Sequence, residues 1–170
     1  MKKTKHFTLI ELLAVMGIIA ILASITFGGL GFASRRADAA KTQAIMEEFV
    51  MALEAFKADR GYYPVQKSAD DVVLKKNNSD SNAWKTFLKG NSKTGKPYMQ
   101  NLKTWDDMSD GEEIELLDAY GKPLQYKCPG SNNKEKFDLW SKGPDKTNGD
   151  KKDSTSKAGD GDDICNWKQN

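Results

Sequence analysis

A long apolar segment near the N-terminus constrains this chain more than any other feature. Residues 7–32, FTLIELLAVMGIIAILASITFGGLGF, carry a single charge, at Glu11. An apolar run of more than about 18 residues is typical of a membrane-spanning helix, and this run as a helix is roughly 39 Å long, enough to cross a bilayer. Lysines 2, 3 and 5 precede it, so the positive-inside rule predicts a cytoplasmic N-terminus and export of everything after Phe32.

A cleaved signal peptide and a simple membrane anchor are the two ordinary interpretations of this apolar segment. A cleaved secretory signal peptide has an apolar region of about 7–15 residues. This region is longer, although Phe32-Ala33-Ser34 is an acceptable cleavage site. A simple single-span anchor is the second possibility. Neither explains Glu11, because a carboxylate near the centre of a membrane helix costs about 2.5–3.5 kcal/mol and is rare without a partner.

The basic leader and the acidic residue together resemble a known family. The stretch KKTKHFTLIELLAVMGIIAILA is similar to the N-terminus of type IV pilins and of the pseudopilins of type II secretion systems. The resemblance implies that a prepilin peptidase cuts between His6 and Phe7 and that the new Phe7 amine is N-methylated. It also implies that Glu11 neutralises the Phe7 amine of a neighbouring subunit in a filament. The family usually has glycine where this chain has His6, which bears on the efficiency of cleavage.

Composition restricts the classes of function that remain. The chain has 170 residues, enough for one domain and a helical anchor. Loss of the leader lowers the basic residues from 26 to 23, against 24 acidic residues, and this balance argues against nucleic-acid binding. His6 is the only histidine, so histidine-based catalysis and His-containing zinc sites are excluded for the mature chain. We predict that the protein is not an enzyme; a membrane-anchored hydrolase with a serine–lysine dyad is the enzymatic alternative.

The helical pattern continues beyond the apolar run. Apolar residues recur every three or four positions up to Phe56, and Gly61 and Pro64 end the pattern. We therefore predict one helix from Phe7 to about Arg60, apolar on all sides in its first half and amphipathic in its second. The first half can lie in lipid or pack against copies of itself. The apolar stripe of the second half contains Ala37, Ala40, Ala44, Ile45, Phe49, Leu53 and Phe56.

Residues 66–117 are the least informative part of the sequence. We expect a short helix to begin within 70–76, and a second one over 81–88 to end at Gly90. The stretch GNSKTGKP, residues 90–97, nearly matches a phosphate-binding loop. Pro97 stands where that motif requires a hydroxyl, so we interpret the stretch as an ordinary loop. Residues 105–110 are a further loop or turn.

The C-terminal third has the alternation of β-strands. Strands are expected over 112–117, 124–128 and 137–141, separated by turns that contain glycine and proline. They would form a small antiparallel meander whose apolar face covers the helical stripe. The fold class is therefore α+β and pilin-like, with a long N-terminal helix packed on a small antiparallel sheet and followed by an irregular C-terminal loop.

The two cysteines, Cys128 and Cys165, are too few and too far apart in sequence for a zinc site. In an exported domain the default expectation is a disulfide between them. It would contribute roughly 3–4 kcal/mol by closing its loop. Two free, buried thiols are the alternative.

The tail from Pro144 onward is rich in aspartate: residues 145, 150, 153, 160, 162 and 163. A hard cation with oxygen ligands would cancel their repulsion. The spacing does not match an EF-hand, and spacing alone favours a solvated acidic loop.

Three ordered motifs in the last third strengthen the resemblance. DAYGKPLQY, FDLWSKGPD and DDICNW are similar to the end of the major pseudopilins, in which the final loop binds calcium. This resemblance implies Ca²⁺ ligands at Asp145 and Asp163, with carbonyl oxygens near Ser141 and Lys142. Asp150 is a further candidate ligand.

These observations lead to one hypothesis with explicit alternatives. Residues 1–6 are a cleaved leader, 7–32 a single-pass inner-membrane and filament-core helix, and 33–170 a periplasmic domain. The protein would be a subunit of a type II secretion pseudopilus. Its partners would be copies of itself, minor pseudopilins, the inner-membrane assembly platform and the prepilin peptidase, and nucleic acid would not be among them. A type IV pilus subunit for adhesion, motility or DNA uptake, a membrane-anchored hydrolase and a non-polymerising sensor anchor are the alternatives.

Overall fold

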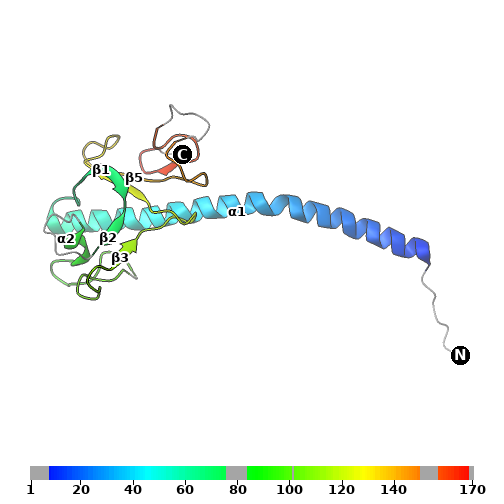
Figure 1. The fold of residues 1–170 in the computed structure, drawn as a ribbon, viewed down its shortest axis with the longest axis horizontal. Helices are drawn as coiled ribbons and strands as arrows, with labels where there is room; N and C mark the ends of the chain where they lie inside the picture. The colour runs from blue at the N-terminus through cyan, green and yellow to red at the C-terminus, as the bar shows by residue number, and fades with distance from the viewer. Residues whose placement is uncertain (1–7, 76–83, 101, 150–156, 169–170) are drawn as a thin grey trace. The chain divides into compact units, whose positions relative to one another are not determined.

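The computed structural model describes residues 8–75, 84–100, 102–149 and 157–168, with the backbone alone described for residues 25–33, 68 and 75. The chain contains two compact units, residues 1–37 and residues 38–170. Helix α1 (Leu9–Arg60) runs through both (Figure 1). All the strands and the short helix α2 belong to the second unit.

Helix α1 confirms the prediction of one helix that extends to Arg60. Gly61 ends it with a φ of 85°, and its N–H donates to the Lys57 carbonyl oxygen over 2.7 Å, as in a glycine C-cap. In the first unit the large apolar side chains of residues 9–22 are exposed, by 83% at Leu9 and 77% at Ile10. Among the described residues, no helix combines the length and the apolar character that a membrane crossing requires.

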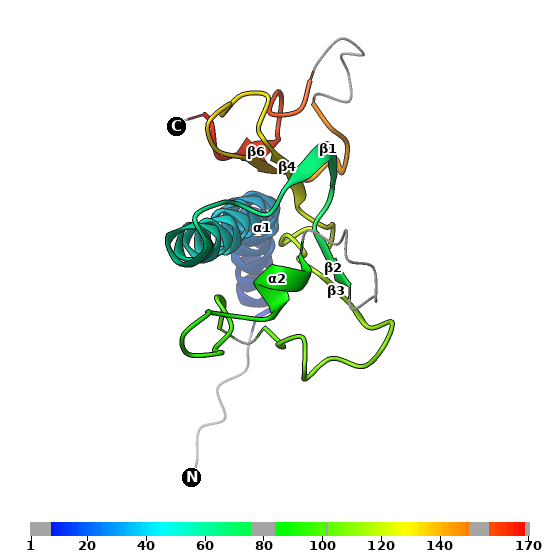
Figure 2. The ribbon, with the colours of Figure 1, turned by 90° about the vertical axis from the view of Figure 1, so that its left-hand side faces the viewer.

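The second half of α1 supplies one wall of the core. Phe49, Leu53 and Phe56, all on the predicted stripe, are completely buried. Helix α2 (Lys85–Leu88) lies against them, since the Phe87 ring is 6.0 Å from the Phe49 ring and 5.7 Å from the Phe56 ring. Gly90, with a φ of 74°, follows α2 where the sequence predicted its end. Figure 2 shows α2 beside the C-terminal part of α1.

A four-stranded antiparallel sheet forms the opposite wall. Its order is β1-β4-β5-β6. The strands are β1 (Gln66–Asp71), β4 (Gln125–Cys128), β5 (Asp138–Ser141) and β6 (Ile164–Cys165). Tyr126 on β4 is fully buried between Trp84 and Phe137, with ring separations of 5.0 and 5.5 Å. Its hydroxyl donates to the Pro64 carbonyl oxygen over 2.9 Å, which ties the segment after α1 to the sheet.

The predicted meander is only partly correct. Strands β4 and β5 pair as expected, with Tyr126 opposite Leu139. The first predicted strand instead forms β3 (Glu113–Glu115), which pairs with β2 (Val73–Lys75) in a separate two-stranded sheet. The direct pairing with the segment before β4 is limited to its end: the Leu124 N–H donates to the Leu116 carbonyl oxygen over 2.8 Å, and Leu117 forms a bridge with Pro123. Val72 contacts both segments, because its N–H donates to the Leu124 carbonyl oxygen and its own carbonyl oxygen accepts from the Leu116 N–H.

The short helix expected to begin within residues 70–76 is wrong. Residues 70 and 71 complete β1, and residues 73–75 form β2. Val72 and Leu74 are both completely buried, with Val73 half-buried between them. That is the two-residue alternation of a strand, and valine favours a pleated, half-buried surface.

Candidate functional site

The N-terminal segment begins with a helix cap that the sequence analysis did not identify. Thr8 precedes α1, and its N–H and hydroxyl donate to Glu11 Oε2 over 2.9 and 2.8 Å. The Glu11 N–H approaches the Thr8 hydroxyl oxygen at 3.3 Å. This is a capping box, in which Thr8 and Glu11 satisfy each other's amide groups. The predicted processing residues His6 and Phe7 lie outside the described part of the chain.

The C-terminal loop places the segment around Asp145 against the segment of Asp162 and Asp163. Gly143 follows β5 with a φ of 61°, and a Cβ at this position would collide with the Asp162 carbonyl oxygen. The Asp145 N–H then donates to Asp162 Oδ2 over 3.1 Å. Asp145 Oδ1 accepts from the N–H and hydroxyl of Thr147, each over 2.8 Å. The chain after β5 therefore lies directly against the Asp162–Asp163 segment.

Asp163 has the least satisfied carboxylate of this group. Its Oδ2 accepts from the N–H groups of Gly149 and Gly159, each over 2.8 Å. Its Oδ1 is buried and has no hydrogen-bond partner among the described residues. Burial is the main cause that raises the pKa of Asp163, and the nearby charges of Asp162 and Asp145 raise it further. Such a group favours binding of either a proton or a cation.

The predicted metal ligands are partly assembled. Asp145 and Asp163 are brought into one loop. Ser141 is buried with its hydroxyl turned to Asp118 at 2.6 Å. The Lys142 ammonium approaches Asp71 at 3.7 Å, and the proposed ligand at this residue is its backbone carbonyl oxygen. Asp150 lies outside the described residues.

Within the described ranges, no three acidic, histidine or cysteine side chains converge as a preformed metal site requires. The donor set nevertheless fits a hard cation such as Ca²⁺, because it consists of carboxylate and carbonyl oxygens and includes the unpartnered Asp163 Oδ1. Asp162 and Asp118 are the residues of this region that sequence reasoning missed. Both could have been noticed from their motifs, because Asp162 is the first residue of DDIC and Asp118 is the first residue of DAYGKP.

The structure contradicts the predicted disulfide, since Cys128 and Cys165 are both free thiols. Strand β5 lies between them: Cys165 pairs with Trp140, whereas Cys128 follows the Lys127–Asp138 pair. With strands about 4.8 Å apart and residues about 3.4 Å apart, this register separates the two Cα atoms by roughly 14 Å. A disulfide tolerates at most about 7 Å. The sequence predicted the strand over 137–141, but not that Cys165 would pair on the side of it opposite to β4.

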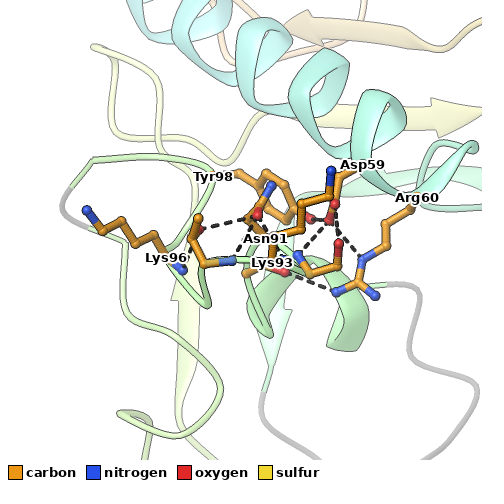
Figure 3. Close-up of polar contacts among 9 residues, drawn as sticks. Asp59, Arg60, Asn91, Lys93, Lys96 and Tyr98 are labelled. Atoms are coloured by element: carbon orange, nitrogen blue, oxygen red, sulfur yellow. Dashed lines mark hydrogen bonds and ion pairs between the residues drawn. The ribbon is translucent and has the colours of Figure 1, made fainter.

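The phosphate-loop-like stretch is confirmed as an ordinary loop, and several of its backbone and side-chain groups make hydrogen bonds within the loop or to α1 (Figure 3). Asp59, near the end of α1, accepts from the Ser92 N–H at 2.7 Å and from the Tyr98 hydroxyl at 2.6 Å, and it also accepts from the Ser92 hydroxyl. These bonds, with the Ser92 hydroxyl first, lower the pKa of Asp59 to about 2. Asn91 Oδ1 accepts from the N–H groups of Lys93 and Thr94, each over 3.1 Å. The loop is thus fastened to α1 rather than open to a phosphate.

Comparison with known proteins decides the family. The sequence profile of the family described as "Type II secretion system (T2SS), protein G" matches residues 32–167. This chain belongs to that family. The N-terminal part of this protein G family member, residues 1–27, also matches the prokaryotic N-terminal methylation motif. The family predicted from the sequence motifs is confirmed.

Several relatives resemble this protein G family member over nearly its whole length. It is 27% identical over 168 residues to type II secretion system core protein G of Aeromonas hydrophila, covering 98% of this chain and 94% of the relative. For the core protein G of Pseudomonas aeruginosa the identity is 29%, covering 98% and 96%. The type IV wide pilus major component PilA4 of Thermus thermophilus is 38% identical over 69 residues, covering 41% of this chain and 53% of the relative.

One solved structure is similar to the protein. It is the major pseudopilin from the type 2 secretion system of enterohaemorrhagic Escherichia coli. The likeness has a TM-score of 0.48 at 19% identity and covers 82% of this chain and 94% of that one.

Proposed function

We propose that this member of the protein G family is a structural subunit of a type II secretion pseudopilus. It would polymerise from the inner membrane into a periplasmic filament that drives protein export. The observation that carries this proposal is that one chain matches the N-terminal methylation motif over residues 1–27 and protein G over residues 32–167. We propose no catalytic activity, in agreement with the structural role of a filament subunit.

The N-terminal segment would have two successive environments. Residues 7–32 would cross the inner membrane once, with the N-terminus in the cytoplasm and residues 33–170 in the periplasm. The prepilin peptidase would remove residues 1–6 and leave an N-methylated Phe7. The exposed apolar side chains of residues 9–22 support this proposal, because a surface that is apolar on all sides is stable in lipid or against copies of the same helix.

Glu11 would link neighbouring subunits through charge. Thr8 supplies hydrogen bonds to the Glu11 carboxylate, but a threonine is neutral and leaves the negative charge in place. Burying an unpaired carboxylate among apolar helices is costly. The Phe7 amine of a neighbouring copy would cancel that charge when the filament forms. Minor pseudopilins and the inner-membrane assembly platform would be the other partners in assembly.

The C-terminal loop would hold one Ca²⁺ ion. Asp163 and Asp145 would bind it, together with carbonyl oxygens near Ser141 and Lys142 and with Asp150 as a further candidate. The ion would supply the positive charge that offsets the repulsion among the aspartates. The buried, unpartnered Asp163 Oδ1 and its neighbours Asp162 and Asp145 support this assignment.

A complementation experiment tests the filament role. In a strain that carries the cognate secretion system but lacks this gene, wild type should restore secretion and periplasmic filaments. Glu11→Gln removes the charge and should reach the membrane fraction at wild-type level while filaments and secretion are strongly reduced. Glu47→Gln makes the same change at an exposed glutamate of α1 and should behave as wild type. Normal filaments with Glu11→Gln would refute the role of Glu11, and intact secretion without the gene would refute the proposed function.

A type IV pilus subunit is the second candidate function. The 38% identity to PilA4 over 69 residues favours it, but that match covers 41% of the chain, whereas the core protein G matches cover 98%. A pilus subunit would give surface fibres, and its loss would impair adhesion, motility or DNA uptake and leave secretion unchanged. The same deletion strain therefore separates the two functions.

A further inference from the structure

Asp118 is a buried carboxylate that the proposed ligand set does not use. It is 5% exposed and lies in the turn that joins β3 to β4. Its Oδ1 accepts from the N–H groups of Tyr120 and Lys122, each over 2.9 Å. Its Oδ2 accepts from the Ser141 hydroxyl over 2.6 Å. One carboxylate thus closes its own turn and holds a residue of a different segment.

Ser141 carries this connection to the aspartate loop. It is completely buried at the last position of β5. Besides donating to Asp118, its hydroxyl oxygen accepts from the Gly143 N–H over 3.0 Å. Gly143 has a positive φ and lies so close to Asp162 that no Cβ would fit. The hydrogen bonds of Ser141 therefore fix the bend through which the chain reaches the acidic residues.

The turn of Asp118 is itself fastened to α1. Thr42 is completely buried on that helix, and its hydroxyl oxygen accepts from the Ala119 N–H over 3.1 Å. The hydrogen bond from Ser141 is accepted by Asp118, and the hydrogen bond to Thr42 is donated by the next residue, Ala119. The bend after β5 is thus connected to α1 through the side chains of Ser141, Asp118 and Thr42.

We propose that Asp118, acting through Ser141, is a positioning residue for calcium binding by the C-terminal loop. This inference rests on the calcium site of the proposed function. The hydrogen bond from Ser141 to Asp118 orients the hydroxyl so that its oxygen can accept from Gly143, which holds the 141–145 backbone against Asp162. Residues that orient a ligand segment contribute about 10- to 100-fold to metal affinity, because the free protein then needs less ordering when it binds.

Full-length protein in detergent micelles provides the test, with CaCl₂ titrated by calorimetry. The variants are Asp118→Asn, which keeps an acceptor for the turn, and Ser141→Ala, which removes the hydroxyl. Asp138→Asn is the matched control. Asp138 is 2% exposed on the same sheet, and it accepts from the N–H groups of Ser131, Asn132 and Asn133 rather than from the acidic loop.

Asp118→Asn and Ser141→Ala should weaken calcium binding by about 10-fold or more, while Asp138→Asn should lower the melting temperature in EGTA and leave the calcium Kd unchanged. A wild-type Kd in both Asp118→Asn and Ser141→Ala, or an equal loss of affinity in Asp138→Asn, would overturn the positioning role and leave the calcium site standing. Absence of binding by wild type would overturn the calcium site itself. Melting temperatures in EGTA separate reduced folding from reduced affinity.

Discussion

The substitution Asp163→Asn tests the calcium loop most sharply. The buried Asp163 Oδ1 lacks a hydrogen-bond partner among the described residues, and an unsatisfied buried polar group costs about 1–3 kcal/mol. An asparagine keeps an oxygen that can accept from the Gly149 and Gly159 amides and removes the repulsion by the nearby aspartates. We therefore expect Asp163→Asn in EGTA to be at least as stable as wild type.

In the presence of calcium, wild type should become more stable than Asp163→Asn. At a free concentration of 100 times its Kd, a ligand that binds only the folded state adds about 2.7 kcal/mol. For a chain of this size that corresponds to a rise in melting temperature of roughly 5–10 °C. Wild type should show this rise in CaCl₂, and Asp163→Asn should not. The assay is thermal unfolding of the full chain in micelles, followed by circular dichroism.

A control in the same loop separates ligation from general charge. Asp160 accepts from the Lys157 N–H over 2.9 Å and pairs with Lys168 at 3.2 Å, so Asp160→Asn should keep the calcium-dependent rise. The reasoning about Asp163 is refuted if Asp163→Asn retains the full rise, or if its stability in EGTA falls by more than about 1 kcal/mol, the size of an ordinary hydrogen bond.

Three further predictions follow from the second unit. The pKa of Asp59 falls from 3.8 to about 2 on folding, so its ionised carboxylate stabilises the fold above pH 3.8, and this effect is lost as the pH falls toward about 2. The unfolding free energies of wild type and Asp59→Asn, measured in urea, should therefore converge over that range. Phe56→Ala should lower the unfolding free energy by about 3–5 kcal/mol, measured in urea, because the ring is fully buried against three other rings. Since Cys128 and Cys165 are free thiols, a reductant should leave the melting temperature unchanged, and a fall of several degrees would contradict the strand register.

Features with local causes could be predicted from the sequence. The length of α1 followed from its apolar period and from Gly61. Of the predicted apolar stripe, Phe49, Leu53 and Phe56 are buried as expected, whereas its alanines at 37, 40 and 44 are exposed. Strands β4 and β5 followed from alternation within four or five residues. In each case the residues that determine the element lie inside it or directly beside it.

Features that depend on distant residues could not be predicted. Of the predicted strand 112–117, residues 113–115 pair with β2, which is distant in the sequence, and only Leu116 and Leu117 pair directly with the segment before β4. The predicted disulfide is wrong for a similar reason, since β5 lies between the strands that carry the two cysteines. At the candidate site, Asp145 and Asp163 were identified through family resemblance. The role of Asp118 depends on a hydrogen bond across 23 positions, which no local pattern encodes.

The capping box of Thr8 and Glu11 is an intermediate case. Its T-x-x-E spacing is visible in the sequence, although the charge of Glu11 pointed only to a role in assembly. The two roles are compatible, because the cap satisfies hydrogen bonds and the neighbour's amine would supply charge. Thr8→Ala should therefore weaken the start of α1 without removing the charge that assembly is proposed to need.

The mass of the N-terminal peptide of the native protein tests the central claim most directly. The protein is purified from membranes of a strain that contains its own secretion machinery and is analysed by mass spectrometry. The account predicts a chain that begins at Phe7 and carries one added methyl group on its amine. A chain that begins at Met1, or at a residue beyond Ser34, would contradict the assignment of this protein as a processed filament subunit.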